Sequence, residues 1–288
     1  MDFRQQFLVT KNRFNFSELP TKVDLGLTEE ELKSRLKKNR KKKHELQERL
    51  YAEDKRSLLI VFQAMDAAGK DSTIREVFKG LNPQGTGFFS FKAPSKEELA
   101  HDFLWRCNAR LPERGNINVF NRSHYEETLV VRVHPGYLLG QALPNVLKPE
   151  DATQQFWDTR FEMINDWEER LAKSGTTVIK FFLNVGLDEQ KNRFLRRLNR
   201  PDKNWKFNFG DLKERSQWEK YMKAYADMLP KTSTASAPWY AIPADDKPVM
   251  RTVVSEIIKD TLNGMNPQYP SASAEFEEEK VEALKILS

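Results

Sequence analysis

One stretch in the first third of the chain has the residue types and spacing of a phosphate-binding loop. The apolar residues 57–64 lead into the small-residue turn Asp66-Ala67-Ala68-Gly69-Lys70-Asp71, and a helix-like segment follows. In such a loop the backbone N–H groups and the N-terminus of the next helix form a cradle for anions, and the lysine adds a positive charge. The pattern predicts phosphate binding by Ala67, Ala68, Gly69, Lys70 and Asp71.

The loop departs from the usual pattern at two positions. Ala64 stands where the first glycine would be, and Asp71 stands where Ser or Thr would hold a metal ion. A carboxylate beside a phosphate chain is repelled unless a divalent cation lies between them. Mg²⁺ prefers one or two carboxylates with phosphate oxygens and water. We therefore predict Asp66 as the metal ligand, and for Asp71 a cap of the helix N-terminus is an equal alternative.

A second cluster follows a predicted strand and opens a helical segment. If the sheet is doubly wound, its strand ends line the ligand crevice, and Asn121 and Arg122 face the site. Arg122 is suited to clamp a transferring phosphoryl group. Asn121 stands where many nucleotide kinases have an acid, and we expect Glu126, one turn further along the same face, to supply the missing negative charge. For His124 and Tyr125, packing or helix capping is the simpler interpretation.

A third cluster carries nine cations between residues 191 and 215, with aromatic residues among them. Placed between two helices, this composition resembles the lid of a small kinase, which closes over phosphates and excludes water. The cations assigned to the lid are Arg193, Arg197, Lys203, Lys213 and Arg215, and Lys206 is assigned to phosphate binding. A separate basic run, 37–43, is either a solvated face or a tether for a polyanion.

Strands and helices alternate along the chain, which predicts a parallel sheet with helices on both faces. The predicted domains are an N-terminal arm and helix (1–54), a phosphotransferase domain (55–265) and an acidic, partly mobile tail (266–288). Strands are expected at 57–64, 87–92, 116–121, 176–183 and 239–243, and helices at 29–53, 69–80, 95–110, 123–133, 150–173, 187–199, 211–229 and 249–263.

Composition restricts the class of protein. The 288 residues carry a net charge of +5, and 31% of them are charged, which favours a solvated surface and an anionic partner. No apolar run approaches the roughly 20 residues that span a bilayer, so no membrane partner is expected. The N-terminus has no apolar signal-peptide core, and Cys107 is the only cysteine. We therefore expect a cytoplasmic protein.

Taken together, these motifs resemble the polyphosphate kinase 2 family over about residues 50–260. Asn121-Arg122-Ser123, with Asn where most of the family has Asp, is similar to the class III branch, which is taken to phosphorylate both AMP and ADP. The matching segments are 64–71, 80–85, 104–106, 120–126, 131–135, 204–207, 210–213 and 237–247.

The resemblance implies a P-loop kinase-like, three-layer α/β/α fold with a mainly parallel five-stranded sheet and a helical lid. It assigns the loop aspartate to Asp66, the loop lysine to Lys70, the strand-end pair to Asn121 and Arg122, and the lid to about residues 190–225. It further implies Mg²⁺ (with Mn²⁺ as a substitute), inorganic polyphosphate, adenine or guanine nucleotides, and a homo-oligomer.

We therefore predict transfer of a terminal phosphoryl group between polyphosphate and a nucleotide, without a protein nucleophile. The predicted catalytic residues are Asp66, Lys70, Asn121, Arg122 and Glu126, and further polyphosphate contacts are expected from Arg75, Lys79, Arg106 and Arg132. An ATP-dependent nucleotide or nucleoside kinase of the same fold remains the alternative. A non-enzymatic nucleic-acid binder fits less well, because it would not need the phosphate loop.

Overall fold

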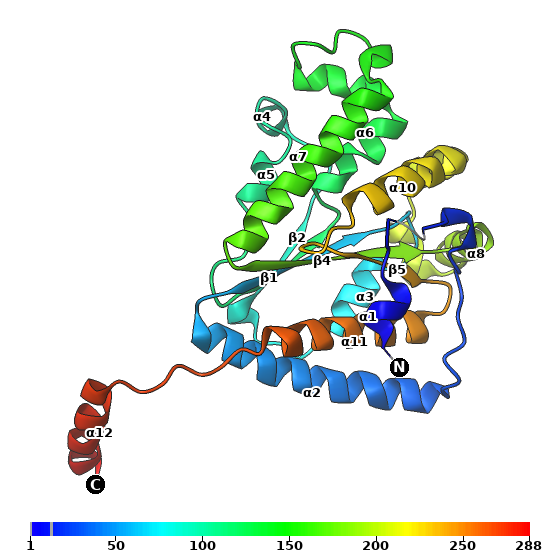
Figure 1. Cartoon of the computed structure of the whole chain (residues 1–288). Helices are drawn as coiled ribbons and strands as arrows, with labels where there is room; N and C mark the ends of the chain where they lie inside the picture. Colours follow the sequence, from blue (N-terminus) through cyan, green and yellow to red (C-terminus); the bar gives the residue numbers. More distant parts are fainter. Residues whose placement is uncertain (1, 12–13) are drawn as a thin grey trace.

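A five-stranded parallel sheet forms the centre of the computed structural model, which describes residues 2–11 and 14–288 (Figure 1). The strand order is β2-β3-β1-β4-β5, with bounds Thr86–Ser90, Ile117–Asn121, Ser57–Gln63, Thr176–Asn184 and Trp239–Pro243. In the register, Phe62 of β1 lies opposite Asn121 of β3 and Phe181 of β4. The carboxyl ends of the central strands therefore meet at one edge, where a doubly wound sheet binds its ligand.

Helices cover both faces of the sheet, so the predicted three-layer fold is confirmed. On one face lie α2 (Glu29–Glu53), α3 (Lys70–Val77) and α11 (Lys247–Met265); on the other lie α7 (Gln154–Lys173) and α10 (Trp218–Thr232) (Figure 1). Every residue of β1 is buried, as expected for a strand covered on both faces. Thr28 and Glu31 form the predicted capping box at the start of α2.

Three predicted helices are interrupted. The helix expected over 95–110 divides into α4 (Lys96–Leu99) and α5 (Trp105–Asn108), because the Asp102 carboxylate accepts the Leu104 N–H and starts a new turn. The segment 123–133 divides into η3 (His124–Glu127) and α6 (Val130–Val133). The helix expected over 211–229 divides at Gln217 into α9 (Phe209–Ser216) and α10.

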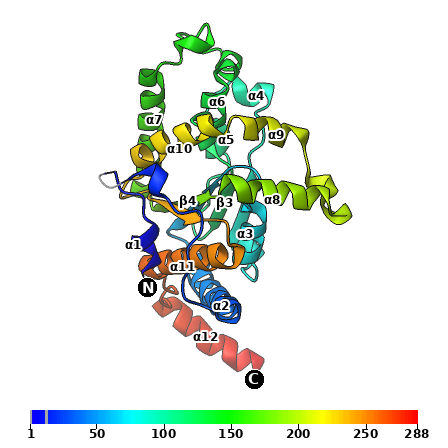
Figure 2. The same ribbon diagram turned by 90° about the vertical axis from the view of Figure 1, so that its right-hand side faces the viewer.

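The remaining elements connect these layers or project from them. Figure 2 shows α8 (Leu187–Leu198) and α9, from the segment predicted as the lid, projecting beside the carboxyl end of the sheet. The short elements are α1 (Phe3–Phe7), η1 (Phe16–Glu18), η2 (Pro83–Gly85), η4 (Pro135–Gln141), η5 (Pro149–Asp151) and η6 (Pro201–Lys206).

The two ends of the chain differ in their packing. Phe3 and Phe7 of α1 are buried, and Val9 N donates to Trp239 O at 2.9 Å, so the N-terminal arm packs beside β5. The tail forms a helix, α12 (Ala274–Leu287), which the sequence pattern did not predict; it extends away from the sheet (Figure 1). The division into domains stays a prediction. Within the described ranges, no helix is long and apolar enough to cross a bilayer.

Candidate active site

The phosphate-loop segment connects β1 to α3 at the carboxyl edge of the sheet. Ala67 (φ +61°) and Gly69 (φ +107°) both have left-handed backbone conformations, which fold the turn tightly. The buried Lys70 ammonium donates to Ala64 O at 2.6 Å. Burial lowers the pKa of Lys70, and the neighbouring Arg122 lowers it further. The loop therefore has the backbone and the charge that a phosphate site requires.

Arg122 connects the end of β3 to the loop. Its guanidinium donates to Asp66 Oδ1 at 2.9 Å, and its backbone N–H donates to Phe62 O at 3.1 Å. Arg122 also has a positive φ of +64°, which costs a residue with a Cβ about 1–3 kcal/mol. This strained backbone directs the arginine back toward the loop, as its predicted role requires.

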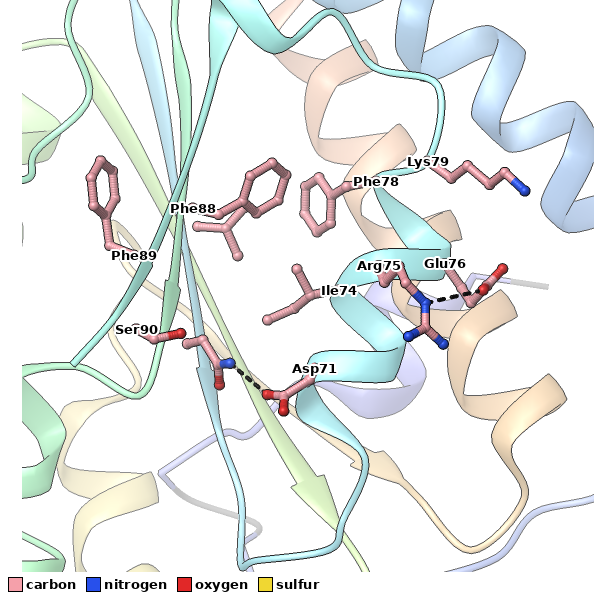
Figure 3. A pocket seen from close by; sticks show the side chains of 11 residues that line it. Asp71, Ile74, Arg75, Glu76, Phe78, Lys79, Phe88, Phe89 and Ser90 are labelled. Carbon is pink, nitrogen blue, oxygen red and sulfur yellow. Dashed lines mark hydrogen bonds and ion pairs between the residues drawn. The ribbon is translucent and has the colours of Figure 1, made fainter. Parts of the chain in front are cut away.

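Asn121 and Asp71 form a second link between β3 and the loop. Asn121 Nδ2 donates to Asp71 Oδ1 at 2.6 Å, and Figure 3 shows this bond at one end of a groove. Asn121 Oδ1 is buried and has no hydrogen-bond partner among the residues described. This oxygen is therefore available to a water molecule or a cation.

A small cavity of about 160 Å³, here called the loop cavity, lies between the loop and the lid helices. Asp66, Arg122, Glu126, Glu214 and Tyr221 are among its lining residues. Burial raises the pKa of Glu126; Asp66 adds to the rise, and Arg122 opposes it. The predicted residues Asp66, Arg122 and Glu126 therefore do converge on one space.

A larger cavity of about 570 Å³, here called the aromatic cavity, is also lined by Arg122 and Glu126. Sequence reasoning missed it, because its lining comes from short elements between β2 and α7 that are far apart in the chain. Its lining includes Phe91, Lys92, His101, Phe103, Arg106, Ser123, Tyr137 and Gln141. Rings with a few polar groups are typical of a site for a small organic ligand.

The predicted lid cations have different surroundings. The structure corrects the prediction that Arg193 is a lid cation. Its guanidinium donates to Ala68 O at 2.5 Å and to Ala244 O at 2.6 Å, and it pairs with Glu189 at 2.7 Å. It therefore fixes the shape of the loop and is not a free lid arginine. Arg215 is likewise engaged, donating to Leu187 O at 2.8 Å and to Gln190 Oε1 at 2.7 Å.

Other lid cations lie at the surface. Arg197 pairs with Asp211 at 3.3 Å, Lys203 pairs with Asp202 at 3.1 Å, and the Lys206 ammonium lies 4.8 Å from the centre of the Trp205 ring. Lys213 is exposed on α9. The sequence motifs gave Asp211 no role of its own; burial raises its pKa, and the negative charge of Asp66 adds to the rise.

Four further predicted phosphate contacts divide between the site and other surfaces. Arg106 lines the aromatic cavity and donates to Lys92 O at 2.7 Å. Arg132 does not line either cavity and instead pairs with Asp227 at 2.6 Å. Arg75 and Lys79 line a separate groove of about 700 Å³ along α3, shown in Figure 3, that begins at Asp71.

His124 and Tyr125 belong to a buried polar network beneath the site, in agreement with the packing interpretation. Tyr125 Oη donates to Glu168 Oε1 at 2.9 Å, and Lys180 of β4 forms an ion pair with the same carboxylate. All four side chains are buried. The network anchors η3, which carries Glu126.

This arrangement can be compared with known proteins. The sequence model of the family described as polyphosphate kinase 2 matches residues 26–270. The chain is 46% identical to an ADP-polyphosphate phosphotransferase of Rhodopseudomonas palustris, over 93% of each chain. It is 45% identical to an AMP/ADP-polyphosphate phosphotransferase of Meiothermus ruber, over 82% of this chain and 83% of that one.

A solved structure of a similar protein has the same fold. The crystal structure of polyphosphate kinase 2 from Arthrobacter aurescens superposes with a TM-score of 0.89 at 36% identity, covering 99% of this chain and 97% of that one. The sequence match and the shared fold both extend over most of the molecule. The chain belongs to the polyphosphate kinase 2 family.

Proposed function

We propose that this protein transfers the terminal phosphoryl group of inorganic polyphosphate to both AMP and ADP, as class III members of the family do. One observation carries the proposal: Arg122 and Glu126 line both the loop cavity and the aromatic cavity. A phosphate chain on the loop and a nucleotide in the aromatic cavity would therefore meet at Arg122. Phosphoryl transfer between polyphosphate and a nucleotide is the reaction class of the family, and the chain is an enzyme of that class.

The aromatic cavity is the proposed nucleotide site. Its volume of about 570 Å³ is in the range of small-molecule sites, and its rings offer stacking surfaces to a base. Arg106 and Lys92 line the same cavity and could pair with nucleotide phosphates. Stacking alone does not separate adenine from guanine, so we propose that GMP and GDP are also accepted.

The phosphate loop is the proposed donor site, and it fits a divalent cation. Within the described ranges, no three His, Cys, Asp or Glu side chains form a preformed metal centre. Asp66 and Asn121 Oδ1, which has no hydrogen-bond partner in the described part of the chain, are hard oxygen donors, the type that Mg²⁺ combines with phosphate oxygens and water. We propose that these residues hold Mg²⁺, with Mn²⁺ as a substitute; the ion would neutralise charge on the phosphates.

The protein's own residues supply positioning and charge. The acceptor phosphate oxygen is already anionic, so it attacks the terminal phosphorus directly while the bond to the bridging oxygen breaks, leaving a polyphosphate one unit shorter. Lys70 and the loop N–H groups would hold the donor phosphates. Arg122 would spread the charge that develops on the transferred group. This scheme requires no protein nucleophile.

Product analysis with AMP and, separately, ADP as acceptor tests the proposal, with long-chain polyphosphate as the only donor. ADP and ATP from AMP, together with ATP from ADP, would support it. ATP from ADP alone would retain the family reaction and reject the class III assignment. Product only with ATP as donor would indicate an ordinary nucleotide kinase. We also propose that the protein is cytoplasmic and that it forms a homo-oligomer; light scattering of the purified protein would test the oligomeric state.

A further inference from the structure

The C-terminal helix α12 stands apart from the rest of its own chain. None of the residues described in this 14-residue helix is buried, and Figure 1 shows the helix separated from the body of the molecule. A helix of this length is only marginally stable in water by itself. In proteins, most of a helix's stability comes from packing its apolar face against another surface. We therefore looked for the surface that α12 fits.

The side chains of α12 indicate what that surface must be. Phe276, Leu284 and Leu287 follow the spacing i, i+8, i+11, so they share one face of the helix. Phe276 and Leu284 are 52% and 59% exposed. Glu277 and Glu279 flank this face, and the helix carries five glutamates and two lysines, a net charge of −3. A matching surface would be apolar with a basic rim.

The groove along α3, shown in Figure 3, has this character. It encloses about 700 Å³, and Ile74, Phe78 and Phe88 form its apolar floor. Phe88 is 53% exposed, and its ring lies edge-on to Phe78 with 5.5 Å between the ring centres. Arg75 and Lys79 line the same groove. We call these five residues the α3 groove.

The strand that forms one wall of the groove is incompletely covered. In the described ranges β2 is an edge strand, which pairs with β3 alone. An exposed strand edge is commonly covered by a helix or a loop. The carboxylates beside the groove are already engaged, because Glu76 accepts from Arg40 at 2.9 Å and Asp71 accepts from Asn121 at 2.6 Å. The basic rim is therefore available to an acidic helix.

The connection to α12 directs the helix away from the groove of its own chain. The carbonyl of Met265, the last residue of α11, accepts from Arg56 at 2.5 Å, so α11 ends at the amino edge of the sheet. The linker 266–273 contains Pro267 and Pro270, and proline favours stiff, extended backbone. Figure 1 shows the linker running outward. A second copy of the chain is therefore the occupant that fits.

We propose that α12 of one copy packs into the α3 groove of a second copy, and that two copies exchange these helices reciprocally to form a two-fold dimer. The inference rests on the homo-oligomer proposed above and is independent of the proposed reaction. Phe276 and Leu284 are about 12 Å apart along α12, and the eight residues of α3 rise by about the same distance. Both side chains can therefore contact the apolar floor while the flanking glutamates meet the basic rim.

Sedimentation of full-length variants tests the proposal. Leu284→Asp on the helix and Phe88→Asp in the groove should each raise the Kd of the dimer at least about tenfold, because each puts a charge into an apolar interface. Both residues are exposed within the chain, so folding should be retained, which circular dichroism melting checks. Leu147→Asp is the matched control: Leu147 is 83% exposed and lies outside α12 and the groove, so the Kd should stay unchanged.

A charge exchange tests the basic rim. Glu279→Lys should weaken the dimer, and adding Lys79→Glu in the same chain should restore it. Crosslinking then identifies the contact. A mixture of Leu284→Cys and Phe88→Cys chains should crosslink at the mass of two chains, whereas the wild type, whose Cys107 is buried, should not.

Four outcomes would overturn the helix exchange. A dimer that survives both Asp variants would retain the homo-oligomer but place its interface elsewhere, and equal weakening by Leu147→Asp would do the same. A Leu284→Cys/Phe88→Cys double variant that crosslinks only at the mass of one chain would show α12 in the groove of its own chain. A monomeric wild type would refute both the exchange and the homo-oligomer, and would leave the proposed reaction unaffected.

Discussion

Asn121 Nδ2 lies 2.6 Å from Asp71 Oδ1, so the last residue of β3 is hydrogen-bonded to the first turn of α3. The bond joins two segments 50 positions apart in the sequence. An amide can donate to a carboxylate at this distance, whereas a second carboxylate would repel it. The residue at position 121 therefore decides how much negative charge the loop must accommodate.

Asn121→Asp should make the protein more dependent on a divalent cation. Two carboxylates about 4 Å apart repel by about 1 kcal/mol in bulk water and about 4 kcal/mol near a protein surface, unless one is protonated or a cation lies between them. In the folded Asn121→Asp variant, the pKa of one of the two carboxyls is raised above its value in the unfolded chain. The free energy of unfolding therefore falls as the pH rises through that raised pKa. Tm without metal should fall more at pH 7.5 than at pH 5, and Mg²⁺ should restore it. Asn121→Ala, which removes the bond without adding charge, should show no such pH dependence.

Lys70→Met should reduce kcat by roughly a hundred- to a thousandfold, because one preorganised charge at the transferring phosphate is lost. Tm should hold or rise, since burial disfavours the Lys70 ammonium and lowers its pKa. Circular dichroism melting and product assays on the same sample separate these effects. Near-wild-type turnover would remove Lys70 from the mechanism.

Arg122→Lys should weaken use of both substrates, because Arg122 borders both cavities. A lysine cannot reproduce the planar fork of guanidinium donors. We expect kcat to fall about a hundredfold and the KM values for polyphosphate and nucleotide to rise together. Arg132→Lys is the matched control, because Arg132 pairs with Asp227 on another surface. A rise in only one KM for Arg122→Lys would contradict its position between the two sites.

Lys43 should make stability depend on pH. Its ammonium is fully buried, donates to Val77 O at 2.5 Å, and has its pKa lowered to about 7, first by burial and then by Arg40. Between pH 7 and 10.5 the unfolded chain binds a proton that the folded chain does not. The contribution of Lys43 to the free energy of unfolding therefore increases as the pH rises through that window.

The expected gain is about 2 kcal/mol between pH 7 and pH 9. Urea unfolding at both pH values should show this rise in the wild type and a smaller one in Lys43→Met. Lys42→Met, a half-buried neighbour, should keep the wild-type slope. Parallel slopes for wild type and Lys43→Met would show that Lys43 keeps an ordinary pKa.

The sequence alone determined the sheet and the loop, because both depend on local patterns. Apolar runs such as 176–183 are long enough to form buried strands. Gly69-Lys70 directly follows such a run, so residue type and spacing are sufficient to locate the phosphate loop. Asn121 and Arg122 were also found, since they follow the next buried strand and parallel strand ends meet at one edge.

Tertiary structure decided the partners of each charge. A run of cations looks the same in sequence whether its members face a substrate or bond to the backbone. Only the fold brings Arg193 to the carbonyls of residues 67, 68, 244 and 245, and turns Arg132 toward Asp227. The aromatic cavity likewise combines short elements that have no common period in the sequence. The role of each charged side chain depends on its burial and on hydrogen bonds to residues far away in the sequence. Local residue spacing does not predict either of these.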